Sequence, residues 1–426
     1  MTDHDIDQGR FDALMNAFGP FERASHVAVG VSGGADSMAL AILLSDWAER
    51  QGGSATALIV DHGLRPESGT EALIVSKALT ALGVENQVLR WASGDVMSGV
   101  QSKARHARYA LMEAWCKQAN VLHLAVAHHA DDQAETVLMR MEKGSGPDGL
   151  SGIPETRELK HCRLLRPFLN VRKQALIRFL DDLGVCWVHD PSNDDPKYAR
   201  TVIRSGIVKD NVDIDGVVTC ATRYGRVRDV AETAAARWLA RYADLKPTGY
   251  LALDRAALKD AAEDTGLRVL SRAATVIGGK TYPPAISATE RLLQHLADGR
   301  AATISRSLFT VKKDTVVVFR EMRNLPNAQS VVGHEIHWDG RFSIATDQND
   351  LNLKVLAFGQ LNLTNVSELD VPNWFSDLPS PVQRTIPVIC SRNKILMPEP
   401  NGPKKQGVSL RFLPKIPLVG MGFSVA

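Results

Sequence analysis

Apolar runs alternate with longer stretches of helical periodicity through the first 200 residues. The runs that predict strands are Val27–Val31, Ala57–Asp61, Gln87–Trp91 and Leu122–Ala127. The stretches between them that predict helices are Ser37–Gln51, Gly69–Leu82 and Val100–Ala119. This alternation predicts an α/β fold, a doubly wound and mostly parallel sheet with helices on both faces. Ligands of such sheets bind at the carboxyl ends of the strands.

The pattern changes after about Gly206. Helical spacing returns at Thr219–Ala243, Asp254–Val276 and Ser287–Ala297, and runs typical of strands follow at Ala302–Ser305, Thr315–Arg320, Leu353–Ala357 and Ile386–Ile389. The predicted organisation is a first domain over residues 1–213, a small helical domain over 214–325 and a small, mainly β domain over 330–426.

Composition narrows the class of protein. Apolar residues make up 44% of the chain and charged residues 23%, as in ordinary globular proteins, and no apolar run approaches the ~18 residues of a membrane span. The five cysteines lack the spacing of a zinc or iron–sulfur site, and the acidic N-terminus lacks the apolar segment of a secretory signal. We expect a cytoplasmic protein with reduced thiols, and the sequence leaves its oligomeric state open, a homodimer included.

Charge is segregated along the chain although the net charge is only +2. Residues 157–209 contain 11 basic and 6 acidic residues, residues 335–379 contain 2 and 7, and residues 381–426 contain 7 and 1. Segregated basic stretches are what binding to a nucleic-acid backbone requires. Charge alone is equally compatible with an ordinary solvated surface.

The segment Ser32–Ser37 lies between the first predicted strand and the first predicted helix. Its glycines and small residues predict a tight turn in which backbone amides and the amino end of the helix bind a phosphate. Asp36 would repel a phosphate unless a cation lay between them, so the pattern indicates ATP bound with Mg²⁺. An ordinary Gly-Ser turn is the alternative. A Walker A loop is excluded, because Gly279-Lys280-Thr281 has Ala274 where the first glycine should be.

Polar residues also follow the second predicted strand. Asp61 and His62 could contact a ribose or an adenine there, and Arg65 could reach a phosphate. A polar turn with Arg65 in solvent is the alternative.

The fourth predicted strand is followed by His128–Thr136. Asp131 is the predicted N-cap of the next helix. Asp131, Asp132 and Glu135 share one helix face, where carboxylates could hold Mg²⁺ or an ammonium group. The alternatives are a zinc site that includes the histidines and a purely structural capping cluster.

The third predicted helix carries basic residues. Arg105 and Tyr109 share a face, and Arg108 lies on an adjacent one. A helix that exposes its charges to water is the simpler interpretation of this segment taken alone.

Taken in order, these segments resemble the tRNA(Ile)-lysidine synthase family of the PP-loop superfamily. The segments that carry the resemblance are Ser32–Ser37, Val60–Arg65, Ala104–Tyr109, Ala127–Thr136, Gly149–Pro154, Arg166–Leu169 and Trp187–Asn193. They cover residues 1 to about 205. The remainder matches the family only in length and layout.

The resemblance implies a reaction in two steps. ATP adenylates the C2 oxygen of the wobble cytidine in an isoleucine tRNA with a CAU anticodon, and pyrophosphate leaves. The ε-amine of free L-lysine then attacks C2, and AMP leaves. The basic stretches would bind the tRNA.

The resemblance also implies roles for individual residues. The nucleotide would be held by Ser32, Gly33, Gly34, Ala35, Asp36, Ser37, Asp61, His62, Arg65 and His128. Asp36 and Asp132 would hold Mg²⁺, and Glu135 would position the lysine ammonium. Arg105 and Arg108 would stabilise phosphate charge or hold the tRNA.

The chain departs from the family pattern in two places. Thr201 stands where the family usually has an asparagine between Arg200 and the residues leading to Arg204, and His189 stands where an acid is frequent.

The rival within the superfamily is a tRNA thiolase, which the isolated cysteines disfavour. An amidotransferase would need a nucleophilic N-terminal cysteine, and a non-catalytic RNA-binding protein would not need carboxylates beside a phosphate loop.

Overall fold

The computed structural model describes residues 5–61, 63, 68–91, 100–188, 199–209, 211–331, 335–347, 353–361, 371–391 and 394–420. The chain divides into two compact units, the first ending at Asp229 and the second beginning at Val230. The boundary falls within the long helix α9 (Ile214–Tyr242). The domain boundaries expected from the sequence stay a prediction.

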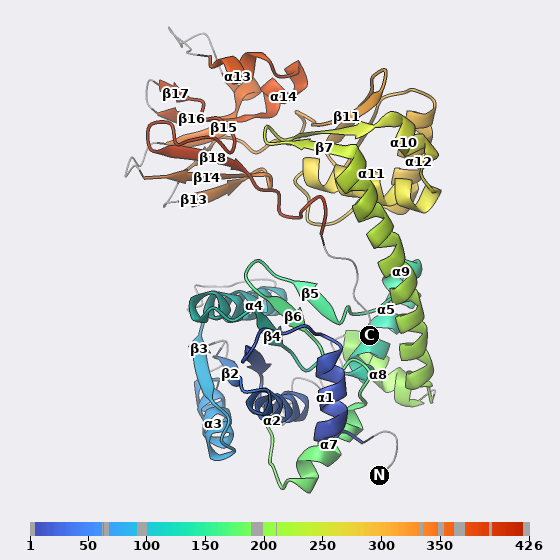
Figure 1. Ribbon diagram of the computed structural model, residues 1–426, viewed down its shortest axis with the longest axis vertical. Coiled ribbons are helices and arrows are strands. Elements are labelled where there is room, and N and C mark those ends of the chain that lie inside the picture. The colour runs from blue at the N-terminus through green and yellow to red at the C-terminus, as the bar shows by residue number, and fades with distance from the viewer. Residues whose placement is uncertain are drawn as a thin grey trace. The chain divides into compact units, whose positions relative to one another are not determined.

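Unit 1 is built on a six-stranded sheet with the order β3-β2-β1-β4-β6-β5 (Figure 1). The strands are β1 (His26–Val31), β2 (Ser54–Asp61), β3 (Asn86–Arg90), β4 (His123–Ala125), β5 (Thr156–Glu158) and β6 (Arg163–Leu165). All pairings are parallel except that of β5 with β6. The mostly parallel α/β sheet is therefore confirmed, and the short strands β5 and β6 are additions to the prediction.

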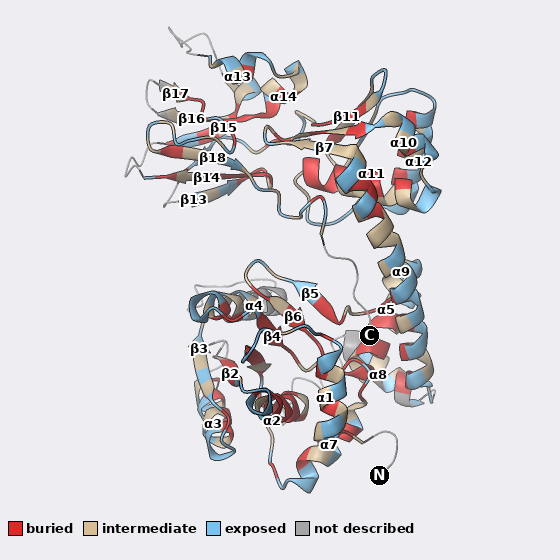
Figure 2. Cartoon of the chain, in the orientation of Figure 1, coloured by how far each residue is buried: buried red, intermediate tan, exposed pale blue. Residues whose placement is uncertain are grey.

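Helices cover both faces of this sheet. The helices that precede α9 in the chain are α1 (Gln8–Asn16), α2 (Ala35–Arg50), α3 (Ser68–Ala81), α4 (Val100–Ala119), α5 (Ala130–Glu142), α6 (Pro147–Leu150), α7 (Lys173–Asp182) and α8 (Ala199–Lys209). Val27 and Val29 of β1 contribute to a core that includes residues of α1, α2 and α7, whereas Ala28 contributes to a second core with Met112 and Cys116 of α4. Helix α2 is buried along most of its length, as Figure 2 shows. The alternation of Val27, Ala28 and Val29 between the two cores is what a strand buried on both faces requires.

Unit 2 contains helices and antiparallel sheets. A five-stranded sheet has the order β7-β8-β11-β10-β9 and consists of β7 (Ala243–Lys246), β8 (Tyr250–Asp254), β9 (Ala302–Ile304), β10 (Ser307–Val311) and β11 (Thr315–Arg320). It packs with α10 (Arg255–Asp260), α11 (Glu263–Ile277) and α12 (Ile286–Ala297) around one apolar core. The strands β7 and β8 lie in the region for which the sequence predicted only helices.

Two smaller sheets complete unit 2. One has the order β12-β15-β16-β17, with β12 (Gln329–Ser330), β15 (Lys354–Ala357), β16 (Pro387–Ser391) and β17 (Lys394–Leu396). The other has the order β13-β14-β18, with β13 (Glu335–Trp338), β14 (Phe342–Thr346) and β18 (Val408–Phe412). Two short helices, α13 (Asn373–Ser376) and α14 (Ser380–Thr385), precede β16. The antiparallel strands confirm the mainly β character of the C-terminal region.

A buried ion-pair network joins the five-stranded sheet to the small sheets within unit 2. Asp339 accepts from Arg320 Nη2 (2.9 Å) and from Arg341 Nε (2.7 Å), and all three side chains are at most 1% exposed. Burial lowers the pKa of Arg341 to about 10 although Asp339 opposes the shift. The remaining donors of Arg320 bind the carbonyls of Glu321, Arg323 and Asn324. Buried charges persist because each of them is paired.

One predicted helix is interrupted. The expected helix Asp254–Val276 is two helices, α10 and α11. Asp254 ends β8, and its carboxylate caps α10 by accepting from Ala257 N (2.8 Å). The backbone of Ala261 is extended (ψ 145°), which separates α10 from α11.

Within the described ranges, no helix combines the length and apolar character needed to cross a membrane.

Candidate active site

The segment Ser32–Ser37 forms a tight turn between β1 and α2. Ser32 N donates to Ser37 Oγ (3.2 Å), and Ser37 Oγ donates to Gly34 O (3.0 Å). Gly34 is the N-cap residue of α2, and because glycine has no side chain, it provides no capping hydrogen bond to the first amides of the helix. The uncapped amides at this helix end carry a partial positive charge that favours an anion.

The turn is held tightly from two sides. Gly33 has φ 88°, and a Cβ at this position would lie 2.5 Å from Cγ2 of Val75 on α3, so only glycine fits. Gly33 O accepts from Val188 N (2.9 Å). Val188 belongs to the segment Trp187–Asn193 that carried the family resemblance, and the structure places this residue against the phosphate loop.

Helix α5 begins differently from the prediction. The predicted N-cap, Asp131, is wrong: the N-cap is His129, and the helix starts at Ala130. Asp132 Oδ2 accepts from His129 N (3.2 Å), which makes Asp132 the capping carboxylate of the first turn. The Asp131 side chain is thereby free to point to another helix.

His129 lies among three carboxylates. Its Nε2 is 3.5 Å from Asp36 Oδ2 and 3.6 Å from Asp132 Oδ2, and its Nδ1 is 3.5 Å from Asp131 Oδ2. Burial opposes protonation, but hydrogen bonds with Asp131 and Asp36 and the charge of Asp132 raise the pKa of His129 to about 10. Asp36 and Asp132, from different strand ends, thus contact the same ring nitrogen.

The amino end of α7 also reaches this cluster. Burial raises the pKa of Asp131, but hydrogen bonds from His129 and Lys173 N and the charge of Arg172 outweigh that effect and hold it well below its usual range. Lys173 N donates to Asp131 Oδ2 (2.9 Å), and Lys173 Nζ lies 4.0 Å from Asp36 Oδ2. The sequence interpretation counted Arg172 and Lys173 in the basic stretch 157–209 and assigned them no individual role, since no local motif marks them.

Glu135 lies on the next turn of α5. Its side chain is 1% exposed, and its Oε1 accepts from Nε of Arg204 on α8 (2.7 Å). Its Oε2 is buried and accepts no hydrogen bond from a residue that the structure describes. A buried carboxylate oxygen without a donor is costly in the absence of a ligand, which makes Oε2 a candidate acceptor for a substrate group.

The segment Gly149–Pro154 is fastened to α5 by side chains that the sequence interpretation did not single out. Gln133 accepts from Ile153 N (2.6 Å) and donates to Ile153 O (3.1 Å). Arg140 donates to the carbonyls of Gly149 (2.7 Å) and Gly152 (2.8 Å). These bonds fix the segment along the helix that carries the acidic cluster.

A pocket of about 180 Å³ opens at the ends of the central strands. Its lining includes the candidate site residues Ser32, Asp36, Ser37, Arg108 and His128. The rest of the lining is mainly apolar and includes Val60, Tyr109, Met112 and Val126. The structure thus brings Arg108 and His128 to the phosphate loop, and the apolar walls suit a flat base.

Several predicted residues are placed elsewhere or lie outside the described part. Asp61 accepts from Ser68 Oγ (2.6 Å) and Gly63 N (3.1 Å), so its carboxylate is bonded to the side chain of the first residue of α3. His62 and Arg65 lie outside the described residues, as do His189 and the side chains of Arg105, Arg200 and Thr201.

The residues named for Mg²⁺ fit a metal that substrate phosphates help to hold. Among described side chains, no group of three or more His, Cys, Asp or Glu forms a metal site. Mg²⁺ usually takes only one or two carboxylates together with phosphates and waters. Asp36 Oδ1 is buried and accepts no hydrogen bond from the described part of the chain, so Asp36 has an oxygen to offer. Asp132 contacts the same nitrogen of His129 as Asp36 does.

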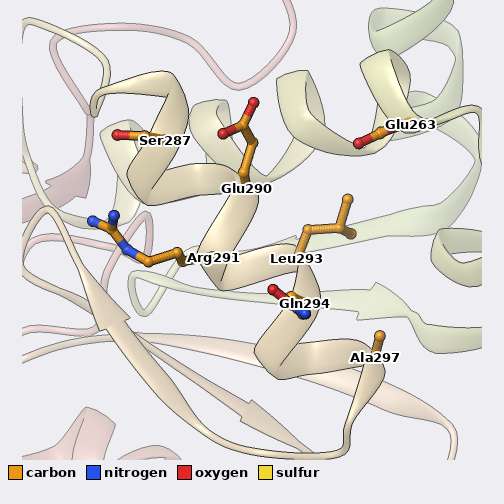
Figure 3. A pocket seen from close by; sticks show the side chains of 7 residues that line it. All are labelled: Glu263, Ser287, Glu290, Arg291, Leu293, Gln294 and Ala297. Carbon is orange, nitrogen blue, oxygen red and sulfur yellow. The ribbon is translucent and has the colours of Figure 1, made fainter.

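A larger hollow, of about 500 Å³, lies in unit 2 along α12. It is lined by Glu263, Ser287, Glu290, Arg291, Leu293, Gln294 and Ala297 (Figure 3). These side chains mix acidic and basic groups on an open helix surface and include no candidate site residue. The chemistry therefore points to the smaller pocket at the strand ends.

The family model of the PP-loop domain matches residues 4–211. The tRNA(Ile)-lysidine synthase of Wolbachia sp. subsp. Brugia malayi (strain TRS) is 35% identical over 347 residues, covering 78% of this chain and 79% of the relative. That of Rhizobium meliloti (strain 1021) is 30% identical over 376 residues, covering 85% and 82%. A solved U34-tRNA thiolase, NcsA from Methanococcus maripaludis, matches with a TM-score of 0.43 at 16% identity, covering 52% of this chain and 78% of that chain. The matches to curated relatives over most of both chains show that this chain belongs to the tRNA(Ile)-lysidine synthase family of PP-loop proteins.

Proposed function

We propose that this chain ligates free L-lysine to C2 of the wobble cytidine in an isoleucine tRNA with a CAU anticodon, using ATP. The observation that carries the proposal is the phosphate loop Ser32–Ser37, which contains Asp36. His129 contacts both Asp36 and Asp132 and so joins the loop to the start of α5. The names of the relatives, which cover most of the chain, support the choice of substrate.

The first step is adenylation of the tRNA. The C2 oxygen of the cytidine forms a bond to the α-phosphorus of ATP, the bond from that phosphorus to the bridging oxygen breaks, and pyrophosphate leaves with the electron pair. The turn amides and Ser37 bind the phosphates. Arg108 lines the same pocket, where its guanidinium can neutralise phosphate charge.

Asp36 and Asp132 would hold Mg²⁺, which would neutralise the negative charge of the leaving group. The chain's own contribution is to aim both carboxylates at one place. His129, which is 3% exposed, contacts both of them.

The second step is attack by the ε-amine of lysine. The neutral amine forms a bond to C2, the bond from C2 to the adenylated oxygen breaks, AMP leaves with the electron pair, and the new nitrogen loses a proton. Glu135 Oε2 is the proposed acceptor for an amino group of the bound lysine. Arg204, which pairs with Glu135 and is 40% exposed, supplies a cation beside it for the carboxylate of that amino acid.

The tRNA is proposed to bind the basic stretch before Lys209, the region 214–325 and the region 330–426. The five cysteines are free thiols, which agrees with the cytoplasmic location we propose.

The test is a ligation assay with the full-length protein. Transcribed isoleucine tRNA with a CAU anticodon, ATP, Mg²⁺ and radioactive lysine should give acid-precipitable lysine together with one pyrophosphate and one AMP per lysine. A methionine elongator tRNA with the same anticodon tests substrate choice. Absence of lysine transfer, or ATP-dependent transfer of sulfur in its place, would contradict the proposal.

A further inference from the structure

The phosphate loop contains no basic residue of its own. A Walker A loop includes a lysine that reaches the outer phosphates, whereas Ser32–Ser37 contributes hydroxyls, amides and the carboxylate of Asp36. Three carboxylates, those of Asp36, Asp131 and Asp132, surround His129 nearby. Phosphates that bind here need positive charge from another part of the chain.

Lys173 is placed to supply it. Its Nζ lies 4.0 Å from Asp36 Oδ2, so Lys173 forms an ion pair with the carboxylate of the phosphate loop. Its backbone is fixed, because Lys173 N donates to Asp131 Oδ2 (2.9 Å) in the first turn of α7. The anchor therefore joins the start of α7 to the start of α5, and the side chain extends toward the phosphate loop.

A purely structural role explains these contacts poorly. The Lys173 side chain is 43% exposed, and 4.0 Å is a long ion pair. Exposed pairs of this kind contribute only about 0–1 kcal/mol. A long, half-exposed side chain whose backbone is fixed can instead move from the carboxylate to a phosphate.

We propose that Lys173 is a catalytic residue of the adenylation step, which rests on the proposed function. Its ammonium contacts the two outer phosphates of ATP and stabilises the negative charge that develops when the bond between the α-phosphorus and the bridging oxygen breaks. The electron pair stays on pyrophosphate, and Lys173 neither gives nor takes a proton. The contact strengthens as charge develops, so it accelerates the step more than it tightens ATP binding.

The experiment compares four full-length proteins, the wild type, Lys173→Met, Lys173→Arg and Arg178→Met. Arg178 lies on the same helix, is 45% exposed and pairs with Asp5, so its loss is a matched change of charge outside the site. Pyrophosphate release is followed in a single turnover with saturating tRNA and ATP. We expect Lys173→Met to slow release about 100-fold, the usual effect of removing one donor to developing charge. Lys173→Arg should recover most of the rate, and Arg178→Met should match the wild type.

Further measurements separate this role from others. The KM for lysine, the Kd for tRNA and the thermal midpoint should change little in Lys173→Met. A raised lysine KM or tRNA Kd with normal pyrophosphate release would overturn the assignment. A slow rate in Lys173→Met that accompanies a lowered thermal midpoint and is not rescued in Lys173→Arg would overturn it as well. If the wild type itself releases no pyrophosphate, the proposed function fails and the role of Lys173 with it. Normal release by both the wild type and Lys173→Met contradicts only the role of Lys173.

Discussion

The charged side chains at the site of unit 1 are largely withdrawn from water, whereas the ion pairs on the surface of the small sheets of unit 2 are exposed. In unit 1, Asp36, Asp131 and Asp132 are between 16% and 25% exposed and surround His129, and Glu135, one turn further along α5, is 1% exposed. On the small sheets of unit 2, Lys404 pairs with Asp347 and Arg411 with Glu335, and these four side chains are between 53% and 67% exposed. Charges withdrawn from water interact strongly, and charges in water are screened. The comparison predicts large effects from single changes in the first group and small effects in the second.

The largest effect is expected at Asp36. Asp36→Asn keeps the shape of the side chain but removes the charge that a cation needs, so pyrophosphate release should fall about 10⁴-fold, or about 5 kcal/mol in the barrier. Asp46→Asn is the matched control, because Asp46 lies on the same helix and pairs only with Arg50 among described side chains. Single-turnover release near the wild-type rate in Asp36→Asn would contradict the role of this carboxylate.

A buried cluster of unit 2 should behave like the charges at the site of unit 1. Asp339→Asn leaves Arg320 and Arg341 buried without a counter-charge, and removal of one partner from such a pair costs about 3–5 kcal/mol of folding free energy. Asparagine tolerates the left-handed backbone of residue 339 (φ 52°), so strain does not confuse the result. Asp347→Asn, which breaks an exposed pair, is the control and should cost less than about 1 kcal/mol. Urea unfolding that shows equal losses for both variants would refute the difference drawn between buried and exposed charge.

Local sequence was a good guide to the parts of the site that lie within one strand–loop–helix segment. The loop Ser32–Ser37 and the acidic residues of α5 follow directly from strand ends, because parallel strands end at one edge of the sheet. Lys173 and Arg204 could not be found in this way, because their contacts with Asp36 and Glu135 join residues far apart in the chain. Asp131 was misassigned as a cap since His129, an unusual N-cap, occupies that place.

The same limit applies to the fold. Strands with long apolar runs, such as β1 and β11, were predicted closely, and β11 has the predicted bounds. The short strands β5, β6, β7 and β8 carry weak patterns, and only pairing with neighbours makes them strands. The basic segment after residue 380 forms β16, β17 and β18 inside the small sheets, so its removal would take strands from both of them.

A buried group without a charged partner gives a pH-dependent effect of intermediate size. Burial raises the pKa of Glu155, which is 9% exposed, to about 7 from 4.5. The folded chain therefore holds a proton that the unfolded chain releases above about pH 4.5, and stability falls as the pH rises from 4.5 to 7. Glu155→Gln should remove this fall and stabilise the protein above pH 7 by up to about 3 kcal/mol, at about 1.4 kcal/mol per pKa unit. Denaturation at pH 5 and pH 8 checks this, and an equal effect of the substitution at both values would contradict it.

The smallest effects are expected on the small sheets. There, an ion pair with an acidic side chain decides whether a basic residue is available to contact a nucleic-acid phosphate. Arg384 and Lys415 are exposed and form no ion pair with a described residue, whereas Lys404 and Arg411 already have acidic partners. If this surface contacts tRNA phosphates, Lys415→Ala and Arg384→Ala should each lower the slope of log affinity against log salt by about one unit. Lys404→Ala should lower it by less than about half a unit, because Asp347 already offsets its charge. Asp347→Ala should raise the slope by releasing Lys404 for a phosphate. Equal slopes for Lys404→Ala and Lys415→Ala would show that these pairs do not control binding, and unchanged slopes in every variant would show that the surface is only solvated.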